Sequence, residues 1–168
     1  MAALPGFLAR LFPNLLAAGT PVVEPATLRD AQVLSQLHRE SFHRGWSAGE
    51  FQQLLAERNV LAHRLRVGKT IAGFIISRTA ADEAEILSVA IDAASRGRGL
   101  SRDLLRTHLG YLAGHGLKTV FLEVEENNRP ACALYERAGF RTVGRRERYY
   151  KDSTGEQLNA LVMQRSLS

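Results

Sequence analysis

The stretch from residue 84 to residue 112 most constrains the fold, because it joins an apolar strand to an amphipathic helix through a glycine-rich turn. The strand is expected over residues 84–91, the turn over 96–99 (RGRG), and leucines recur at helical spacing over 100–112. The free N–H groups of the first helical turn and the helix dipole favour an anion there, and glycine lets a phosphate come close. The turn therefore suits a pyrophosphate. A solvated, arginine-rich turn is the plain alternative.

In the remaining chain, segments with the two-residue period of a strand alternate with segments that have the 3.6-residue period of a helix. We expect further strands at residues 22–23, 60–67, 70–78, 119–124, 141–150 and 157–164, and further helices at 27–42, 48–56 and from 127 or 128 to 138. This interleaving predicts a mixed α/β fold that is not doubly wound.

No repeat or linker divides the sequence, so we expect a single domain over residues 21–168. Residues 1–20 are an extension with apolar residues at helical spacing, which Pro5 and Pro13 interrupt. A short docking or frayed helix and a partner- or membrane-binding helix both remain open for it.

The composition limits which binding partners, metals and cellular locations this chain can be expected to have. The formal net charge is +5 over 168 residues, which favours anionic partners, but no run of Lys and Arg reaches five, so we expect no direct nucleic-acid readout. Cys132 is the only cysteine and the five histidines lack ligand spacing, so we predict no disulfide and no metal. No apolar run approaches the ~20 residues needed to span a bilayer. A cytoplasmic location is expected.

Two motifs carry a family resemblance: residues 96–101 (RGRGLS), and Asn128 with residues 133–140 (ALYERAGF). They are similar to the Gln/Arg-x-x-Gly-x-Gly/Ala signature and to the second signature of the GNAT superfamily of N-acetyltransferases. Ser101 departs from the usual Gly or Ala, but it is small and its hydroxyl can bond a phosphate. The resemblance implies a mostly antiparallel sheet of six to seven strands with about four helices, and acetyl-CoA as co-substrate.

The resemblance also implies roles for single residues. Glu123 would be the base that takes a proton from the acceptor amine, and Tyr135 the acid that protonates the leaving thiolate. Strand alternation puts Glu123 on the non-core face, where most glutamates are merely solvated, and Glu125 is the second candidate. Tyr135 as a packed aromatic and Asn128 as a helix cap are the alternatives. The implied cofactor contacts are Val89, Ile91, Arg96, Gly97, Arg98, Gly99, Leu100, Ser101, Arg102, Asn128 and Tyr135.

Finer features resemble one branch, the bacterial ribosomal-protein-alanine N-acetyltransferases (RimI type). These are residues 41–47 (SFHRGWS), 121–124 (FLEV) and 146–150 (RERYY), with the stretch 152–160. The resemblance implies that the acceptor is a protein N-terminal amine, that of a small-subunit ribosomal protein. It also implies a peptide groove lined by Trp46, Tyr149 and Tyr150, although plain aromatic packing would account for these residues too.

Three alternatives stay open. The acceptor can be a lysine or a small-molecule amine, or the chain can be a non-catalytic module that binds acyl-CoA or the ribosome. We expect direct transfer rather than a covalent intermediate on Cys132, because a helical cysteine beside small residues is usually buried filler.

Overall fold

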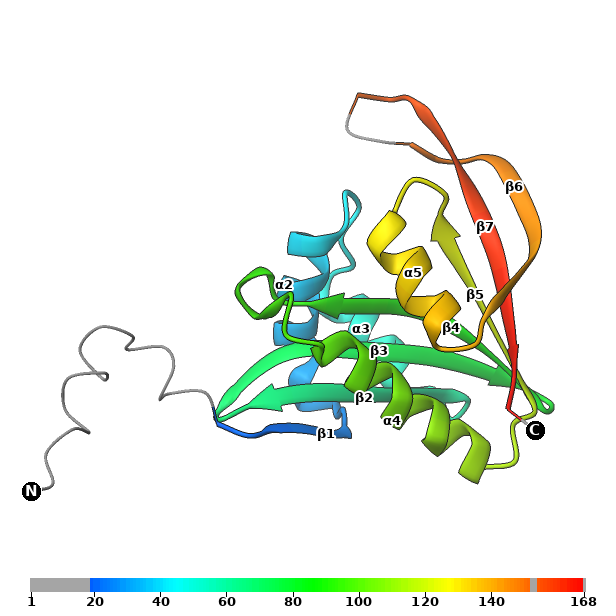
Figure 1. The fold of residues 1–168 in the computed structure, drawn as a ribbon. Coiled ribbons are helices and arrows are strands. Elements are labelled where there is room, and N and C mark those ends of the chain that lie inside the picture. Colours follow the sequence, from blue (N-terminus) through cyan, green and yellow to red (C-terminus); the bar gives the residue numbers. More distant parts are fainter. Residues whose placement is uncertain (1–18, 152–153, 168) are drawn as a thin grey trace, which may run out of the picture.

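The computed structural model describes residues 19–151 and 154–167, in which seven strands form one sheet in the order β1-β2-β3-β4-β5-β7-β6 (Figure 1). Every neighbouring pair is antiparallel except β4 and β5, which run parallel. The expected mixed, mostly antiparallel sheet is therefore confirmed. The strands are β1 (Pro21–Pro25), β2 (Val60–Val67), β3 (Thr70–Ala80), β4 (Glu83–Ile91), β5 (Thr119–Glu125), β6 (Arg141–Lys151) and β7 (Gln157–Ser166). The predicted extension lies, up to residue 18, outside the described residues.

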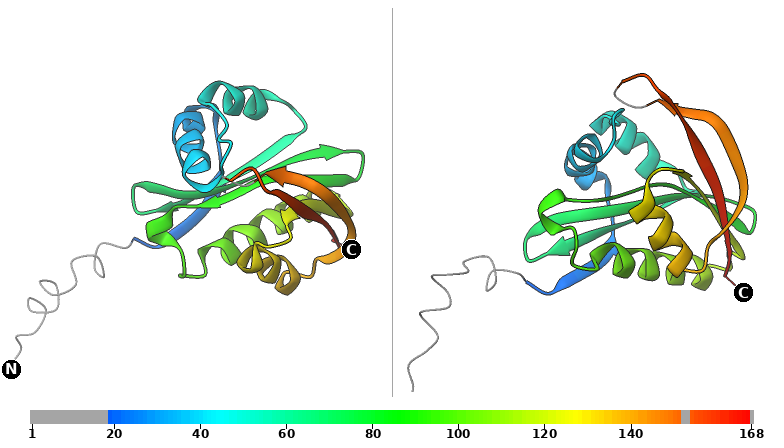
Figure 2. Two further views of the ribbon diagram at one scale, coloured as in Figure 1. Left: turned by 90° about the horizontal axis from the view of Figure 1, so that it is seen from above. Right: turned by 45° about the horizontal axis from the view of Figure 1, so that its top comes forward.

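Helices cover both faces of the sheet. Figure 2 shows α2 (Ala31–Ser41) and α3 (Ala48–Ala56) on one face, and α4 (Leu100–Gly114) and α5 (Arg129–Arg137) on the other. Short 3₁₀ turns, η1 (Leu28–Asp30) and η2 (Ala93–Ser95), precede α2 and α4. None of the helices within the described ranges is long and apolar enough to cross a membrane.

Local sequence signals set the helix starts. Ser47 accepts a hydrogen bond from the Glu50 N–H while the Glu50 carboxylate accepts one from Ser47, so a capping box begins α3 as expected. The helix expected from residue 27 differs, because it opens with η1 before α2. The Asp30 carboxylate accepts the Thr27 N–H and also pairs with Arg64 of β2, and these bonds stabilise the tighter first turn.

Each helical layer has its own apolar core. Under α4 and α5, Leu104, Leu105 and Leu112 pack with Ile75 and Leu122. The second core lies under α2 and α3 and contains Leu34, Phe51, Phe74 and Ile76. Burying each such side chain stabilises the fold by about 1.5–3 kcal/mol.

Strands β4 and β5 separate after four pairs. Their parallel ladder runs from Glu83 opposite Thr119 to Ile86 opposite Leu122, and both strands continue beyond it. Figure 1 shows them diverging, with α5 following β5 and the turn to α4 following β4. The two elements that carry the sequence motifs therefore begin at the same opening in the sheet.

Candidate functional site

The turn after β4 has the geometry of an anion cradle. Gly97 and Gly99 have φ of 75° and 74°, and Gly99 is the N-cap of α4. A Cβ at either glycine would meet no atom within 4 Å, so the space beside this backbone is open to a ligand. Leu100 is buried and anchors the first turn of α4 in the core. The residues present thus fit a diphosphate held by main-chain N–H groups.

The arginines of this turn differ in what they do. Arg96 donates from Nε to the Ile91 carbonyl at 3.1 Å, which ties the turn to the end of β4. The side chain of Arg102 is 76% exposed, and Arg98 is exposed as well. These two cations lie beside the cradle, where they attract negative charge. Ser101 is half-buried in the first turn of α4.

Helix α5 forms the other side of the opening. Asn128 caps it, because its Oδ1 accepts the Ala131 N–H at 3.2 Å. Tyr135 is buried, with its ring edge-on to Phe140 at 5.8 Å between centroids. Cys132 is also buried, and burial raises the pKa of its thiol, as expected of a packing residue rather than a nucleophile.

Glu123 is not a free surface glutamate. Its side chain is 15% exposed, and Oε1 accepts a hydrogen bond from Arg146 Nε at 2.9 Å. The Tyr149 hydroxyl donates to the same carboxylate, and this bond together with the negative charge raises the pKa of Tyr149. The Arg146 guanidinium carbon lies 5.2 Å from the centre of the Tyr149 ring. These three side chains, the Glu123 cluster, form one interacting unit.

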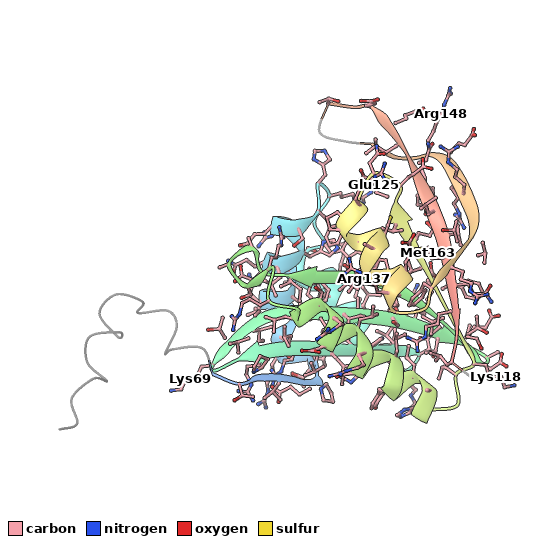
Figure 3. The ribbon with its side chains drawn as sticks, in the orientation of Figure 1. Lys69, Lys118, Glu125, Arg137, Arg148 and Met163 are labelled. Carbon is pink, nitrogen blue, oxygen red and sulfur yellow. The ribbon has the colours of Figure 1, made fainter. Side chains whose placement is uncertain are left out.

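An irregularity in β6 brings the cluster together. Glu123 pairs with Val162 of β7, which pairs with Gly144 of β6, and the β6–β7 register then shifts between residues 146 and 150. Arg148 has φ of 56° there, and its N–H donates to Asn159 Oδ1. Figure 3 shows Arg148 high on the β6–β7 hairpin, with Glu125 of β5 below it. Because such a bulge bends the strand, Arg146 and Tyr149 reach across β7 toward β5.

A hollow of about 320 Å³ lies beside Glu123. Val120, Leu122 and Val124 pack under α4 and α5, so Glu123 and Glu85, which lies opposite Phe121, occupy the other face. Three glutamates, Glu83, Glu85 and Glu123, outnumber the two arginines of this hollow, so it suits a cationic group. The lining residues are Arg78, Thr79, Ala80, Glu83, Ala84, Glu85, Phe121, Leu122, Glu123, Arg146 and Val162.

Trp46 lies farther along this face and is well anchored. Its ring stacks on His38 at 4.5 Å, and the main-chain N–H of Trp46 donates to His38 Nδ1. Burial lowers the pKa of His38 to about 4. Trp46 therefore packs in the α2–α3 core, yet it also lines a second hollow, together with Glu50 and Arg78. Arg78 lines both hollows, whereas the side chain of Tyr150 lies outside the described part.

Some residues around this opening carry no signal in the sequence. Arg146 stands within the 146–150 motif, yet no local signal pairs it with Glu123, which is far away along the chain. No sequence motif marks Glu85 or Ser88, which both lie on β4. The hydroxyl of Ser88 is buried. No group of three or more His, Cys, Asp or Glu within the described ranges can hold a metal ion.

Known proteins are similar to this chain in sequence and in architecture. The family model described as the Acetyltransferase (GNAT) family matches residues 31–140. The chain is 34% identical to the N-alpha-acetyltransferase RimI of Mycobacterium tuberculosis, over 80% of this chain and 90% of the relative. It is also 34% identical to the [ribosomal protein bS18]-alanine N-acetyltransferase of Haemophilus influenzae, with the same two coverages. The crystal structure of the ribosomal-protein-S18-alanine N-acetyltransferase from Escherichia coli is similar with a TM-score of 0.84 and 27% identity, covering 89% of this chain and 95% of that one.

Proposed function

Because this chain belongs to the GNAT acetyltransferase family, we propose that it transfers an acetyl group from acetyl-CoA to the N-terminal alanine of a ribosomal protein. The acceptor class is supported by the names of relatives that the chain matches over most of their length. One observation carries the chemistry. A carboxylate, Glu123, lies at the opening between β4 and β5, into which the glycine turn and α5 also lead.

The cofactor is expected to bind along this opening. When bound, acetyl-CoA supplies the acetyl thioester. Main-chain N–H groups of residues 97–101 would hold its diphosphate, and Arg98 and Arg102 would add positive charge. Val89 and Ile91 of β4 would line the path of the acyl arm, and the capped start of α5 at Asn128 would bound its other side.

Glu123 is proposed as the base. An α-amine has a pKa of about 8, so most of it is protonated at neutral pH and must lose a proton to attack. The carboxylates of Glu123 and Glu85 attract the ammonium form into the hollow, and Glu123 removes the proton directly or through one water. To do so, the Glu123 carboxylate has to exchange a hydrogen bond from Arg146 or Tyr149 for one from the acceptor.

Tyr135 is proposed as the acid. It is buried at the α5 side of the opening, on the face opposite Glu123, so proton removal and proton delivery are kept apart. A buried phenol remains protonated at neutral pH and can donate to the thiolate as the thioester breaks.

The acceptor peptide would cross the face that carries Glu123. Trp46, on the loop between α2 and α3, and Tyr149, on β6, would contact the peptide from two sides, and Tyr150 remains a predicted third member. Acidic residues line both hollows, so this face favours a positively charged N-terminal segment.

Intact mass tests the activity and its acceptor. Purified protein and acetyl-CoA should add one acetyl group to a peptide that begins with alanine, but none to the same peptide with a blocked N-terminus and a free lysine. Acetylation of the lysine peptide alone would remove the N-terminal assignment. Acetyl-CoA binding without transfer to any amine would indicate the non-catalytic module instead.

Replacing the base tests the mechanism. Glu123→Gln keeps the shape and a hydrogen-bonding group, so kcat should fall about 10²- to 10⁴-fold while the Kd of acetyl-CoA by calorimetry stays within twofold. Glu125→Gln is the matched comparison on the same strand. A large loss with Glu125→Gln, and little with Glu123→Gln, would assign the base to Glu125.

A further inference from the structure

Ser88 of β4 has a hydroxyl without a hydrogen-bond partner. The residue is 7% exposed, and its Oγ is the one buried side-chain polar atom that lacks a partner among the described residues. Other buried serines differ. Ser77 Oγ lies 2.7 Å from His108 Nε2, and Ser35 Oγ donates to the Trp46 carbonyl at 2.8 Å. An unpaired buried hydroxyl costs free energy, so its presence points to a partner that arrives with a ligand.

The fold directs this hydroxyl to the face that carries Glu123. Ser88 lies directly opposite Ile76 of β3, which belongs to the core under α2 and α3. Directly opposed residues of an antiparallel pair share a face, and Val89 on the next position packs under α4 instead. Ser88 therefore shares the α2–α3 face with Glu123.

The end of the β4–β5 ladder also brings Ser88 to the opening. The last pair is Ile86 with Leu122, so Ser88 is two residues beyond it on β4 and Glu123 is one residue beyond it on β5. The two side chains thus flank the point where the strands separate. The glycine turn and Tyr135 belong to the side covered by α4 and α5.

We propose that Ser88 Oγ binds the acceptor's α-amino group and orients it for attack. This inference rests on the proposed acetyl transfer and adds an acceptor-binding residue to it. The neutral amine carries two protons. Glu123 passes the proton that it took from the ammonium form to solvent, so its carboxylate is free again. Oγ then accepts a hydrogen bond from one N–H of the neutral amine while the nitrogen lone pair attacks the thioester carbon. As the C–N bond forms, Glu123 takes the other proton.

The proposed step balances. The C–N bond forms, the C–S bond breaks, and the thiolate takes a proton from Tyr135. The proton that Ser88 holds remains on nitrogen as the amide N–H of the product. Ser88 itself neither gains nor loses a proton, so its contribution is orientation.

A pair of serine substitutions tests this inference. Ser88→Ala should lower kcat/KM for the alanine peptide about tenfold or more, leave the Kd of acetyl-CoA within twofold, and leave the Tm unchanged or higher, because it removes an unpaired group. Ser77→Ala is the matched control on the neighbouring strand. It removes a paired hydroxyl, so it should lower the Tm and leave kcat/KM for the peptide unchanged.

Each other outcome counts against the inference. If Ser88→Ala lowers the Tm as Ser77→Ala does and leaves kcat/KM intact, the hydroxyl is structural. If it weakens acetyl-CoA binding and leaves the acceptor KM intact, the hydroxyl serves the thioester. Wild-type turnover of the alanine peptide is measured first, so failure of the proposed function is seen separately from failure at Ser88.

Discussion

At the scale of single residues, Glu123 differs from most surface glutamates in its partners. Two donors, Arg146 and the Tyr149 hydroxyl, meet its carboxylate, and little of the side chain is exposed. Charge-assisted hydrogen bonds of this kind fix the direction of a carboxylate. Tyr149, which we expected only to line a groove, is therefore also a candidate for orienting the base.

Removal of the Tyr149 hydroxyl should separate these roles. Tyr149→Phe keeps a ring beside Arg146 but deletes the donor to Glu123, so we expect kcat/KM for the acceptor to fall about tenfold. The Tm should hardly change, because the side chain is half exposed. Because its hydrogen bond to Glu123 raises the pKa of Tyr149, this donor should stay protonated at neutral pH, and the wild-type rate should show no loss of it there.

Tyr111→Phe is the control for that experiment. Tyr111 is partly exposed on α4, where its ring packs on His63, and it takes no part in the Glu123 cluster. An equal loss of kcat/KM in both variants would show that the Tyr149 hydroxyl has no special role.

At the scale of elements, the join between β4 and α4 depends on backbone conformation. Gly99, the N-cap of α4, has a left-handed φ. This conformation directs the backbone of the turn toward the opening, while the side chain of Leu100 stays in the core. A side chain there is strained even though no neighbour would touch it.

Two glycine substitutions on the same helix should act in opposite directions. Gly99→Ala should lower the free energy of unfolding by about 1–2 kcal/mol and weaken acetyl-CoA binding, because the turn can no longer hold its shape without strain. Gly110→Ala, inside α4 with open space around it, should raise that free energy by about 0.5–1 kcal/mol and leave binding unchanged. Urea unfolding and calorimetry with coenzyme A measure both. Unchanged binding in Gly99→Ala would argue against the cradle.

At the scale of the whole molecule, three histidines are buried in its two cores. His38 of α2 stacks between Phe42 and Trp46, whereas His63 of β2 and His108 of α4 face each other, with their Nδ1 atoms 2.8 Å apart. Burial lowers the pKa of His38 to about 4, that of His108 to about 3, and that of His63 as well. Each ring is therefore neutral in the folded protein at neutral pH.

The protein should lose stability in mild acid. Between pH 6.5 and about 4 the unfolded chain protonates these histidines and the folded chain does not, so the free energy of unfolding falls as pH falls. At pH 5 the loss should be up to about 2 kcal/mol for each histidine, and most carboxylates do not yet titrate there. Urea unfolding at pH 7.5 and 5.0 measures the difference. His108→Gln, which takes up no proton, should show a smaller difference, and an equal one would contradict this origin.

The amino-acid sequence determined the elements and the motif positions. The hydrophobic period, the capping pairs Ser47–Glu50 and Asn128–Ala131, and the glycines of the turn act over a few residues, so they can be read locally. That is why the strands and helices lie within a few residues of their predicted ends. The 3₁₀ turn at η1 departs because a distant residue, Arg64, engages Asp30.

Only the tertiary structure decided which of these residues meet. The pairing of Arg146 with Glu123 depends on the β5–β7–β6 register and on the shift in β6, and the facing of His63 and His108 depends on how α4 packs. Ser88, whose Oγ lacks a partner among the described residues, is placed at the opening because β4 and β5 separate just before it. Contacts of this kind join residues far apart along the chain, so they follow from strand register and helix packing, which no short window of sequence contains.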